Sequence, residues 1–289
     1  MGDRLGVAKT YKLFIGGKFP RTESGRTTKV EDAQRGVAAH VCRASRKDVR
    51  EAVEAARKAQ RAWAGATAYL RGQILYRIAE MLESRRAEFA EVLTTEGTSA
   101  DDAQREIDGA IDRAVAYAGW TDKFTQVWGG ANPVAGPYHN FTVPGPVGVV
   151  AVIAPDERPL LGLVTLALGP IAMGSTVLVL ASEANPIPAM VLAEALATSD
   201  VPAGVVNILT GFRDELIEHV AGHREIDAVH AAGVSAEHRQ LLREGAAENL
   251  KRVTVRDTAG DAWFDDACAS PWWIEPFVES KTTWHPSAT

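Results

Sequence analysis

The feature that most restricts the fold of this chain is a regular alternation of short apolar runs with helical segments in its second half. The expected strands lie within 138–154 and at 176–180, 205–209, 226–230 and 251–256, and the expected helices at 160–168, 186–198, 213–221 and 235–246. Strands that alternate with helices predict an α/β fold with a doubly wound parallel sheet. Ligands of such sheets bind beyond the carboxyl ends of the strands.

The first half of the chain predicts helices that precede this sheet. Apolar residues at helical spacing indicate helices over 45–63, 69–93 and 100–128. Near the N-terminus, "YKLFIGGKF" (11–19) is typical of a hairpin. Two strands are expected within 138–154, linked by a turn at Pro144-Gly145-Pro146.

Composition and charge exclude several function classes. The 289 residues carry a formal net charge of −6 and no block of Lys and Arg, so a nucleic-acid partner is not expected. Cys42 and Cys268 are far apart and lack CxxC spacing, so neither a metal site nor a disulfide framework is expected. The first ten residues show no secretory signal, which indicates a cytoplasmic protein.

One stretch is long and apolar enough to imitate a membrane span. Residues 159–180 carry no charge. Gly169-Pro170 and Gly174-Ser175 interrupt them, so we expect a buried helix, a turn and a buried strand. A membrane partner is therefore not expected.

Three charged residues follow an apolar strand in the segment "APDERP" (154–159). Asp156, Glu157 and Arg158 would lie at the carboxyl end of that strand, where ligands bind in an open α/β sheet. Two interpretations are open at this point. The segment is either a catalytic cluster or a place where a catalytic site has been lost.

Five stretches in a fixed order point to one known family. They are "YKLFIGGKF", "VPGPVGVVAVIAP", "AMGSTVLVLASE", "LAEALATSDVPAGVVNILTG" and "NLKRVTV", and the similarity covers about 11–257. In this order they resemble the NAD(P)-dependent aldehyde dehydrogenase superfamily. The resemblance implies a Rossmann-like NAD-binding domain, a separate catalytic domain, and an oligomerisation sheet built from a mid-chain strand pair and a C-terminal strand.

The segment "APDERP" departs from the family's pattern. The resemblance places Trp and Asn after Pro155, with the Asn amide as a donor to the reacting oxyanion. Here the two positions are Asp156 and Glu157. A donor of this kind contributes a few kcal/mol, whereas a carboxylate at Glu157 repels the developing negative charge. We therefore expect the oxyanion-binding function to be lost.

The coenzyme groove is expected to be only partly retained. The resemblance assigns Ser182, Glu183, Gly211 and Gly233 to this groove as vestigial contacts. The family's Lys that binds the adenosine ribose is Leu180 here. We therefore expect no cofactor, with NAD(P) as the alternative that the family implies.

Substitutions after two of these glycines weaken the groove further. The family places glycines after Gly211, at a helix N-terminus that favours anions, and here Phe212 and Arg213 follow instead. Arg213 restores positive charge but adds bulk. A phosphate-binding hydroxyl after Gly233 is replaced by Val234.

The resemblance also locates the general base and the nucleophile. The family's Glu base corresponds to Arg256, which stays protonated and cannot accept a proton from water. The family's catalytic Cys lies well beyond this position, and Cys268 is too close to match it. Cys268 is therefore expected to be an incidental thiol.

The C-terminal residues suggest how the chain is organised. The stretch "IEPFVESKTTWHP" (274–286) resembles the C-terminal strand of the family, so the segment near 257–271 is expected to replace a whole catalytic domain. The expected parts are a hairpin and helices (1–136), an oligomerisation strand pair (137–150), a Rossmann-like part (151–257), a loop (258–271) and a C-terminal oligomerisation strand (272–289).

Three functions are open. We favour a catalytically inactive aldehyde dehydrogenase-like protein that associates with itself or with a full-length aldehyde dehydrogenase. The aromatic residues Trp272, Trp273, Phe277 and Trp284 are the expected interface, although they could instead cover the chain's own core. The alternatives are an active NAD(P)-dependent oxidoreductase on aldehydes and a nucleotide or small-anion sensor.

The charged residues allow one more interpretation of the site. Asp156, Glu157 and Arg158 could form a new cluster with Arg213 and Arg256. Charged side chains at strand ends are functional candidates in this fold. No combination of these residues indicates a particular reaction.

Overall fold

A five-stranded parallel sheet forms the centre of the molecule, in a computed structural model that describes residues 7–32, 36–95 and 97–287. Its strands are β6 (Val149–Ile153), β7 (Thr176–Leu180), β8 (Val206–Leu209), β9 (Ala228–Ala232) and β10 (Arg252–Arg256), in the order β10-β9-β6-β7-β8. This arrangement confirms the expected doubly wound α/β fold. The strand order reverses between β6 and β9, so the topological switch point lies there.

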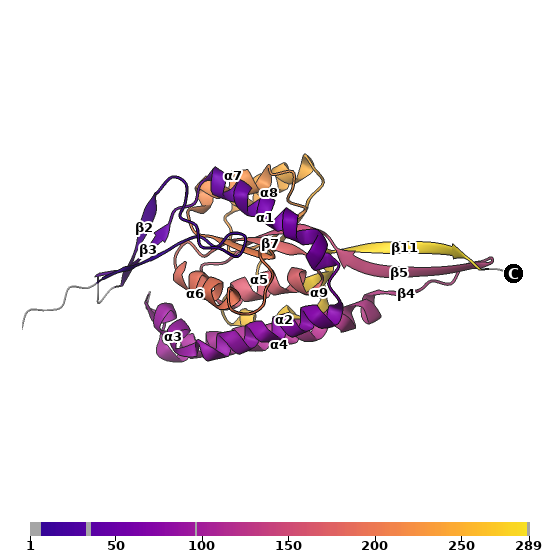
Figure 1. Cartoon of the computed structure of the whole chain (residues 1–289), viewed down its shortest axis with the longest axis horizontal. Helices are drawn as coiled ribbons and strands as arrows, with labels where there is room; N and C mark the ends of the chain where they lie inside the picture. Colours follow the sequence, from indigo (N-terminus) through magenta and orange to yellow (C-terminus); the bar gives the residue numbers. More distant parts are fainter. Residues whose placement is uncertain (1–6, 33–35, 96, 288–289) are drawn as a thin grey trace, which may run out of the picture.

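Helices cover both faces of this sheet. Figure 1 shows α1 (Arg46–Ala64), α7 (Arg213–Ala221) and α8 (Ala236–Ala247) on one face, and α2 (Ala68–Ser84), α3 (Arg86–Thr94), α4 (Ala100–Trp128), α5 (Leu161–Ala172) and α6 (Ile187–Leu196) on the other. Alternate residues of β6 enter the two cores, since Val150 and Val152 pack on the α5 side and Ala151 and Ile153 on the α1 side. Because both faces are covered, β6 to β9 are buried throughout, which explains their nearly continuous apolar runs.

Two expected helix boundaries are wrong. The helix expected over 69–93 is divided at Arg85 into α2 and α3. The turn expected at Gly169-Pro170 is absent, because α5 continues through Pro170 to Ala172. Pro170 has no N–H for the Leu166 carbonyl, and Nδ1 of His230 donates to that carbonyl instead, at 2.9 Å. A side chain from β9 therefore replaces the hydrogen bond that the proline removes.

The uncharged stretch 159–180 forms α5 and β7 inside the core. No helix in the described ranges combines the length and the apolar character needed to cross a membrane.

The N-terminal sheet differs from the expected hairpin. Residues 11–19 form only one bridge of their own, between Ile15 and Lys18. The main hairpin, which was not predicted, is β2 (Thr27–Asp32) with β3 (Gly36–Cys42), and β1 (Lys9–Tyr11) pairs with β3. Residues 1–6 lie outside the described residues, so the structure does not bear on the expected absence of a secretory signal there.

A narrow arm of three strands projects from the body (Figure 1). It consists of β11 (Val278–Pro286), β5 (Tyr138–Pro146) and β4 (Gly130–Ala131), in that order. The turn expected at Pro144-Gly145-Pro146 is wrong, because these residues end β5. Both prolines are tolerated because β4 pairs only with Phe141 and Thr142, which leaves one side of β5 without a partner strand at the prolines.

The strand pair expected at 137–150 is wrong, because its two strands belong to different sheets. β5 pairs with β11 along its whole length, from Val278–Pro146 to Pro286–Tyr138. β6 begins at Val149 and belongs to the central sheet. The paired strands of the arm are therefore 138–146 and 278–286, which lie far apart in the sequence.

The segment expected as a loop at 258–271 folds into short helical turns. These are η1 (Gly260–Phe264), η2 (Asp266–Ala269), α9 (Pro271–Ile274) and η3 (Glu275–Phe277). Polar side chains of α4 hold the segment by donating to its carbonyls: Arg113 to Trp263 at 2.9 Å, Tyr117 to Cys268 at 2.8 Å and Trp120 to Ala269 at 2.8 Å. Trp263 is fully buried, so this segment is part of the core.

Candidate functional site

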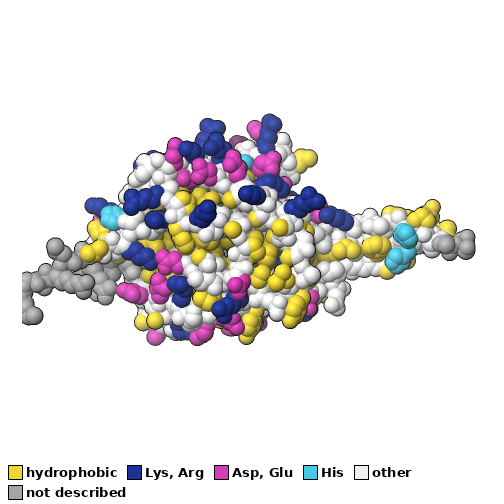
Figure 2. Space-filling view, in the orientation of Figure 1, with side chains coloured by type: hydrophobic (Ala, Val, Ile, Leu, Met, Phe, Trp, Pro, Cys, Tyr) yellow, Lys and Arg dark blue, Asp and Glu magenta, His cyan; other side chains and the backbone are white. Residues whose placement is uncertain are grey.

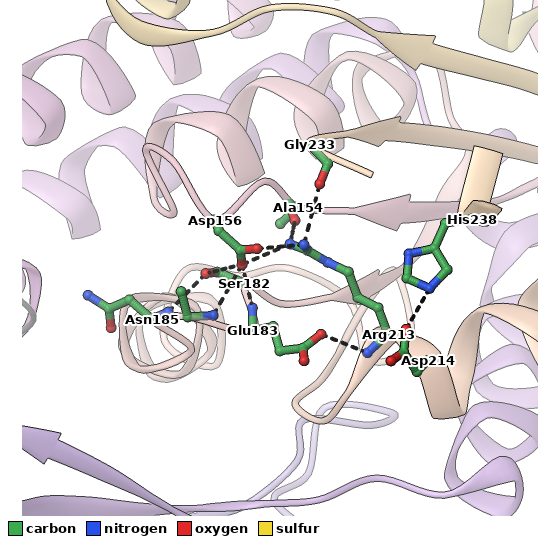
Figure 3. A network of polar contacts seen from close by, with 10 residues as sticks. Ala154, Asp156, Ser182, Glu183, Asn185, Arg213, Asp214, Gly233 and His238 are labelled. Carbon is green, nitrogen blue, oxygen red and sulfur yellow. Dashed lines mark hydrogen bonds and ion pairs between the residues drawn. The ribbon is translucent and has the colours of Figure 1, made fainter. Parts of the chain in front are cut away.

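The candidate site lies at the switch point, beyond the carboxyl ends of β6 and β9. Asp156 follows β6, Gly233 follows β9, and Arg213 is the first residue of α7. Figure 3 shows the Arg213 side chain reaching across to Asp156 and Gly233. Gly233 has a φ of +63°, which glycine adopts without strain.

Arg213 bridges this crevice with its guanidinium group. Nη1 lies 2.6 Å from Oδ2 of Asp156, and Nη2 lies 2.9 Å from Oδ1. The same group donates to the carbonyl of Ala154 at 2.7 Å and to that of Gly233 at 3.4 Å. The side chain of Arg213 is only 9 % exposed. A two-pronged pair of this kind is among the stronger polar contacts in proteins.

Asp156 is held on its other side by the turn after β7. Its Oδ1 accepts hydrogen bonds from Oγ of Ser182 at 2.9 Å, from N of Glu183 at 2.8 Å and from N of Ala184 at 3.1 Å. Burial works to raise the pKa of Asp156, but Arg213 and these donors outweigh it and hold that pKa below its ordinary value. The carboxylate is therefore charged and fixed in place.

A second carboxylate caps the helix that Arg213 begins. Oε2 of Glu183 accepts a hydrogen bond from the backbone N of Arg213 at 2.9 Å. Free N–H groups at a helix N-terminus favour anions, and Glu183 supplies that anion from within the chain. Ser182, Glu183 and Gly211 also line a cavity of about 310 Å³ against the β2–β3 hairpin.

The other charges of "APDERP" do not join this network. Oε1 of Glu157 accepts from the backbone N of Gly260 at 2.6 Å. Arg158 lies 3.5 Å from the carboxylates of Asp102 and Asp261. Both residues therefore contact partners other than Asp156, and Glu157 helps to fix the start of the helical segment 260–277.

Arg256 lies in a different environment from Arg213. Its Nε is 3.1 Å from Nε2 of His230, and its guanidinium stacks on Trp273 at 4.3 Å from the ring centroid. Because Nδ1 of His230 donates to Leu166, Nε2 is the acceptor. Burial and Arg256 hold the pKa of His230 well below its ordinary value, against the Leu166 contact, so this histidine is neutral.

The proposed new cluster is thus only partly present. The structure brings Asp156 and Arg213 together and leaves Glu157, Arg158 and Arg256 with separate partners. His230 was not among the residues expected at the site. The signal available was a histidine inside the apolar strand run "AVHAA".

Cys268 has none of the features of a nucleophile. It is buried, and its Sγ donates to the carbonyl of Ala262 at 3.3 Å. Burial raises the pKa of the thiol, although Arg113 opposes this effect. The thiol is therefore protonated and shielded. In the described part of the chain, no group of three or more His, Cys, Asp or Glu side chains could hold a metal ion.

The four aromatic residues expected at an interface divide into two kinds. Phe277 is fully buried and Trp273 is 9 % exposed, and both pack against His230. Their assignment to an interface is wrong, because they cover the chain's own core. Trp272 is 67 % exposed and Trp284 59 % exposed, so these two remain candidates.

The strand order and the position of this crevice define a Rossmann-like, dinucleotide-binding class of α/β fold, in which the crevice is bridged by the chain's own side chains. The chain belongs to the aldehyde dehydrogenase family, whose profile matches residues 19–263.

Named relatives and solved structures agree with this assignment. The chain is 32% identical over 250 residues to the mitochondrial benzaldehyde dehydrogenase of Antirrhinum majus, covering 84% of this chain and 46% of that one. It is 32% identical over 254 residues to human retinal dehydrogenase 2, covering 86% and 48%. The NAD+ complex of an aldehyde dehydrogenase from Bacillus cereus superposes with a TM-score of 0.80 at 31% identity, over 85% of this chain and 50% of that one. The chain thus spans about half the length of the relatives it matches.

Proposed function

We propose that this chain does not oxidise aldehydes and acts by association, either with a second copy or with a full-length aldehyde dehydrogenase. The observation that carries the proposal is the Asp156–Arg213 ion pair across the switch point. It occupies the crevice where this fold class binds its ligand. An ion pair inside the chain takes the place of a bound coenzyme.

The crevice does not fit a dinucleotide in this arrangement. A pyrophosphate at the N-terminus of α7 would meet the Glu183 carboxylate, which already accepts the backbone N–H of Arg213. It would also approach Asp156, whose charge is fixed by its donors. Two carboxylates at the phosphate position repel the ligand, and the Arg213 side chain fills the space between them.

The residues at the reaction positions support the same conclusion. Oxidation through a thiol adduct needs an oxyanion donor and a base for deacylation. Glu157 stands at the donor position and is engaged with Gly260. Arg256 stands at the base position and packs on Trp273. Neither residue can perform the step that its position requires.

The arm supports association. β11 is the edge strand of the arm and has nine residues, and its side chains are exposed from Ser280 to Pro286. A narrow ribbon of this kind is marginally stable in water without further packing, and an edge strand is a template for pairing. Only Glu279 and Lys281 are charged among the residues of β5 and β11. Figure 2 shows apolar and histidine side chains along the arm, with few charges on this face.

Two measurements test the proposal. Purified protein mixed with NAD+ or NADP+ and a panel of aldehydes should form no NAD(P)H above a blank without protein. Affinity purification from the native cell should recover the chain as an oligomer or with a full-length aldehyde dehydrogenase. Aldehyde-dependent NAD(P)H formation, or a strict monomer that co-purifies with no dehydrogenase, would refute it.

The cavity beside β7 favours one second candidate, a small-anion or nucleotide sensor. The cavity holds about 310 Å³ and is lined by Ser182, Glu183, Gly211 and Lys29. Among the described residues, Lys29 is the one cation of this lining, and the carboxylates of Glu31 and Glu183 oppose an anion there, so this candidate is the weaker one. A thermal-shift screen with AMP, NAD, NADP and coenzyme A tests this candidate, because a ligand of the folded state raises the melting temperature.

A further inference from the structure

A groove between α2 and α4 exposes apolar side chains that neither the crevice nor the arm uses. Its open volume is about 1040 Å³. Its walls include Tyr69, Leu70, Tyr76 and Val115, which are 74 %, 45 %, 53 % and 41 % exposed. Contiguous apolar surface of this kind on a soluble protein marks a site of interaction. We refer to this surface as the α2–α4 groove.

Small residues form the floor of the α2–α4 groove. A Cβ built on Gly72 would lie 2.7 Å from Oγ1 of Thr121, so the two helices approach closely there. Gly119 and Ala118 of α4 also line the groove. Thr121 lies directly against Gly72, and the Lys123 side chain lies over Gly119, so these small residues serve the close approach of the two helices.

The two helices run in opposite directions, which gives the groove two different ends. Gly72, near the start of α2, lies against Ala118 and Thr121. Arg86, just after α2, contacts Asp108. The start of α2 therefore lies beside the second half of α4, and the end of α2 beside the first half.

Each end carries both signs of charge. At one end, Asp122 and Lys123 of α4 line the groove just after Thr121, which lies against Gly72 near the start of α2. At the other end, Arg77 and Glu80 of α2 form a pair at 2.8 Å. A two-fold axis through the middle of the groove would exchange the two ends. Arg77 would then face Asp122 of a second copy, and Glu80 would face its Lys123.

We propose that the α2–α4 groove binds the same groove of a second copy of this chain about a two-fold axis, with Tyr76 of each copy packed against the exposed apolar walls of the other. An isologous interface requires a surface that complements itself, and the exchanged charge pairs meet this requirement. The tyrosines supply the type of rigid aromatic anchor that dominates binding energy. The groove dimer is independent of association through the arm.

Sedimentation equilibrium of the full chain over a concentration series tests the groove dimer. We expect a monomer–dimer equilibrium with a dissociation constant on the order of 1–100 µM. Tyr76→Glu should weaken it at least about tenfold, because the anchor becomes a desolvated charge. Leu250→Glu is the matched control, since Leu250 is 90 % exposed and lies outside the groove and the arm. Circular dichroism checks that each variant is folded.

A charge exchange tests the orientation. Arg77→Glu alone and Asp122→Lys alone each place like charges opposite each other and should weaken the dimer several-fold. The double variant recreates opposite charges and should restore most of the affinity. Failure of the double variant to exceed the single ones would overturn the two-fold arrangement.

The arm variant Trp284→Glu separates this proposal from the proposed function. A dimer that persists in Trp284→Glu and is lost in Tyr76→Glu supports the groove. A dimer that persists in Tyr76→Glu overturns the groove proposal, and its loss in Trp284→Glu would then assign self-association to the arm. A monomer at all concentrations also overturns the groove proposal, whereas recovery of a full-length aldehyde dehydrogenase would still support the proposed function.

Discussion

The carboxylate of Asp156 and the guanidinium of Arg213 form a two-pronged ion pair across the carboxyl ends of β6 and β9, with contacts of 2.6 and 2.9 Å. In the family that the chain resembles, these positions carry neutral residues. The two changes are therefore complementary: a new carboxylate and a new cation meet in the crevice between the strands. The crevice is stabilised by the chain itself.

Removing the cation should cost stability. Arg213→Ala leaves the Asp156 carboxylate without its counter-charge and removes a donor from the Ala154 carbonyl. We expect a loss of about 2 kcal/mol in the free energy of unfolding, between the values typical of buried and of exposed ion pairs. Urea denaturation measures it. The control is Arg239→Ala, which breaks the more exposed contact with Asp257 and should change stability by about 0.5 kcal/mol or less. Equal effects of the two variants would contradict the structural role of Arg213.

His230 should make stability depend on pH. An unfolded histidine has a pKa near 6.5, whereas burial and Arg256 hold the pKa of folded His230 well below that. The unfolded state therefore binds the extra proton as pH falls. Stability from this group is complete above about pH 6.5 and is lost below it at about 1.4 kcal/mol per pH unit, until the folded pKa is reached.

Denaturation between pH 5 and 7.5 checks this dependence in the wild type and in His230→Gln. His230→Gln should lose the part of the pH dependence of the free energy of unfolding that His230 contributes. His285→Gln, on the exposed arm, is the control and should keep it. The same slope in His230→Gln as in the wild type would show that His230 is not a buried neutral group.

Both cysteines should resist thiol reagents in the native state. Cys42 and Cys268 are buried, and burial raises the pKa of the Cys268 thiol. Labelling by a chromogenic disulfide at pH 7.5 should be at least about a hundredfold slower than in urea, because it requires local opening. The Cys42→Ser variant isolates Cys268. Rapid labelling of that variant in buffer would indicate a reactive thiolate and reopen the question of a nucleophile.

The segment 260–277 should be essential to the fold. Trp263→Ala removes a fully buried indole between this segment and the core, and we expect a loss of about 3–5 kcal/mol in the free energy of unfolding. Trp272→Ala is the matched control, because Trp272 is 67 % exposed and makes an edge-to-face contact with Trp128. It should cost about 1 kcal/mol or less. Similar losses of unfolding free energy in the two variants would mean that Trp263 does not hold the segment 260–277 to the core.

The central sheet could be predicted from the sequence because parallel strands that are buried on both faces appear as nearly continuous apolar runs. The runs at 176–180 and 205–209 match the buried strands β7 and β8 closely. The turn at Gly169-Pro170 could not be excluded, because the group that replaces the missing hydrogen bond comes from His230, 60 residues later. Helix-breaking residues predict a break only where nothing distant compensates for them.

The site was predictable by position and only partly by its contacts. The sequence allowed a cluster of Asp156, Glu157 and Arg158 with Arg213 and Arg256, but nothing local indicates which of these side chains meet, and Asp156 and Arg213 are the two that do. The same limit affected the aromatic residues. Trp272 and Trp273 are neighbours in the sequence, and a helical turn exposes one while it buries the other.

The most direct test of a crevice closed by Asp156 and Arg213 is calorimetric titration of the full chain with NAD+. We predict no saturable heat up to about 1 mM coenzyme, since binding would have to break the ion pair and bring phosphate beside two carboxylates. Saturable binding with a dissociation constant below about 100 µM would contradict it, and would mean that Arg213 moves aside to admit the coenzyme.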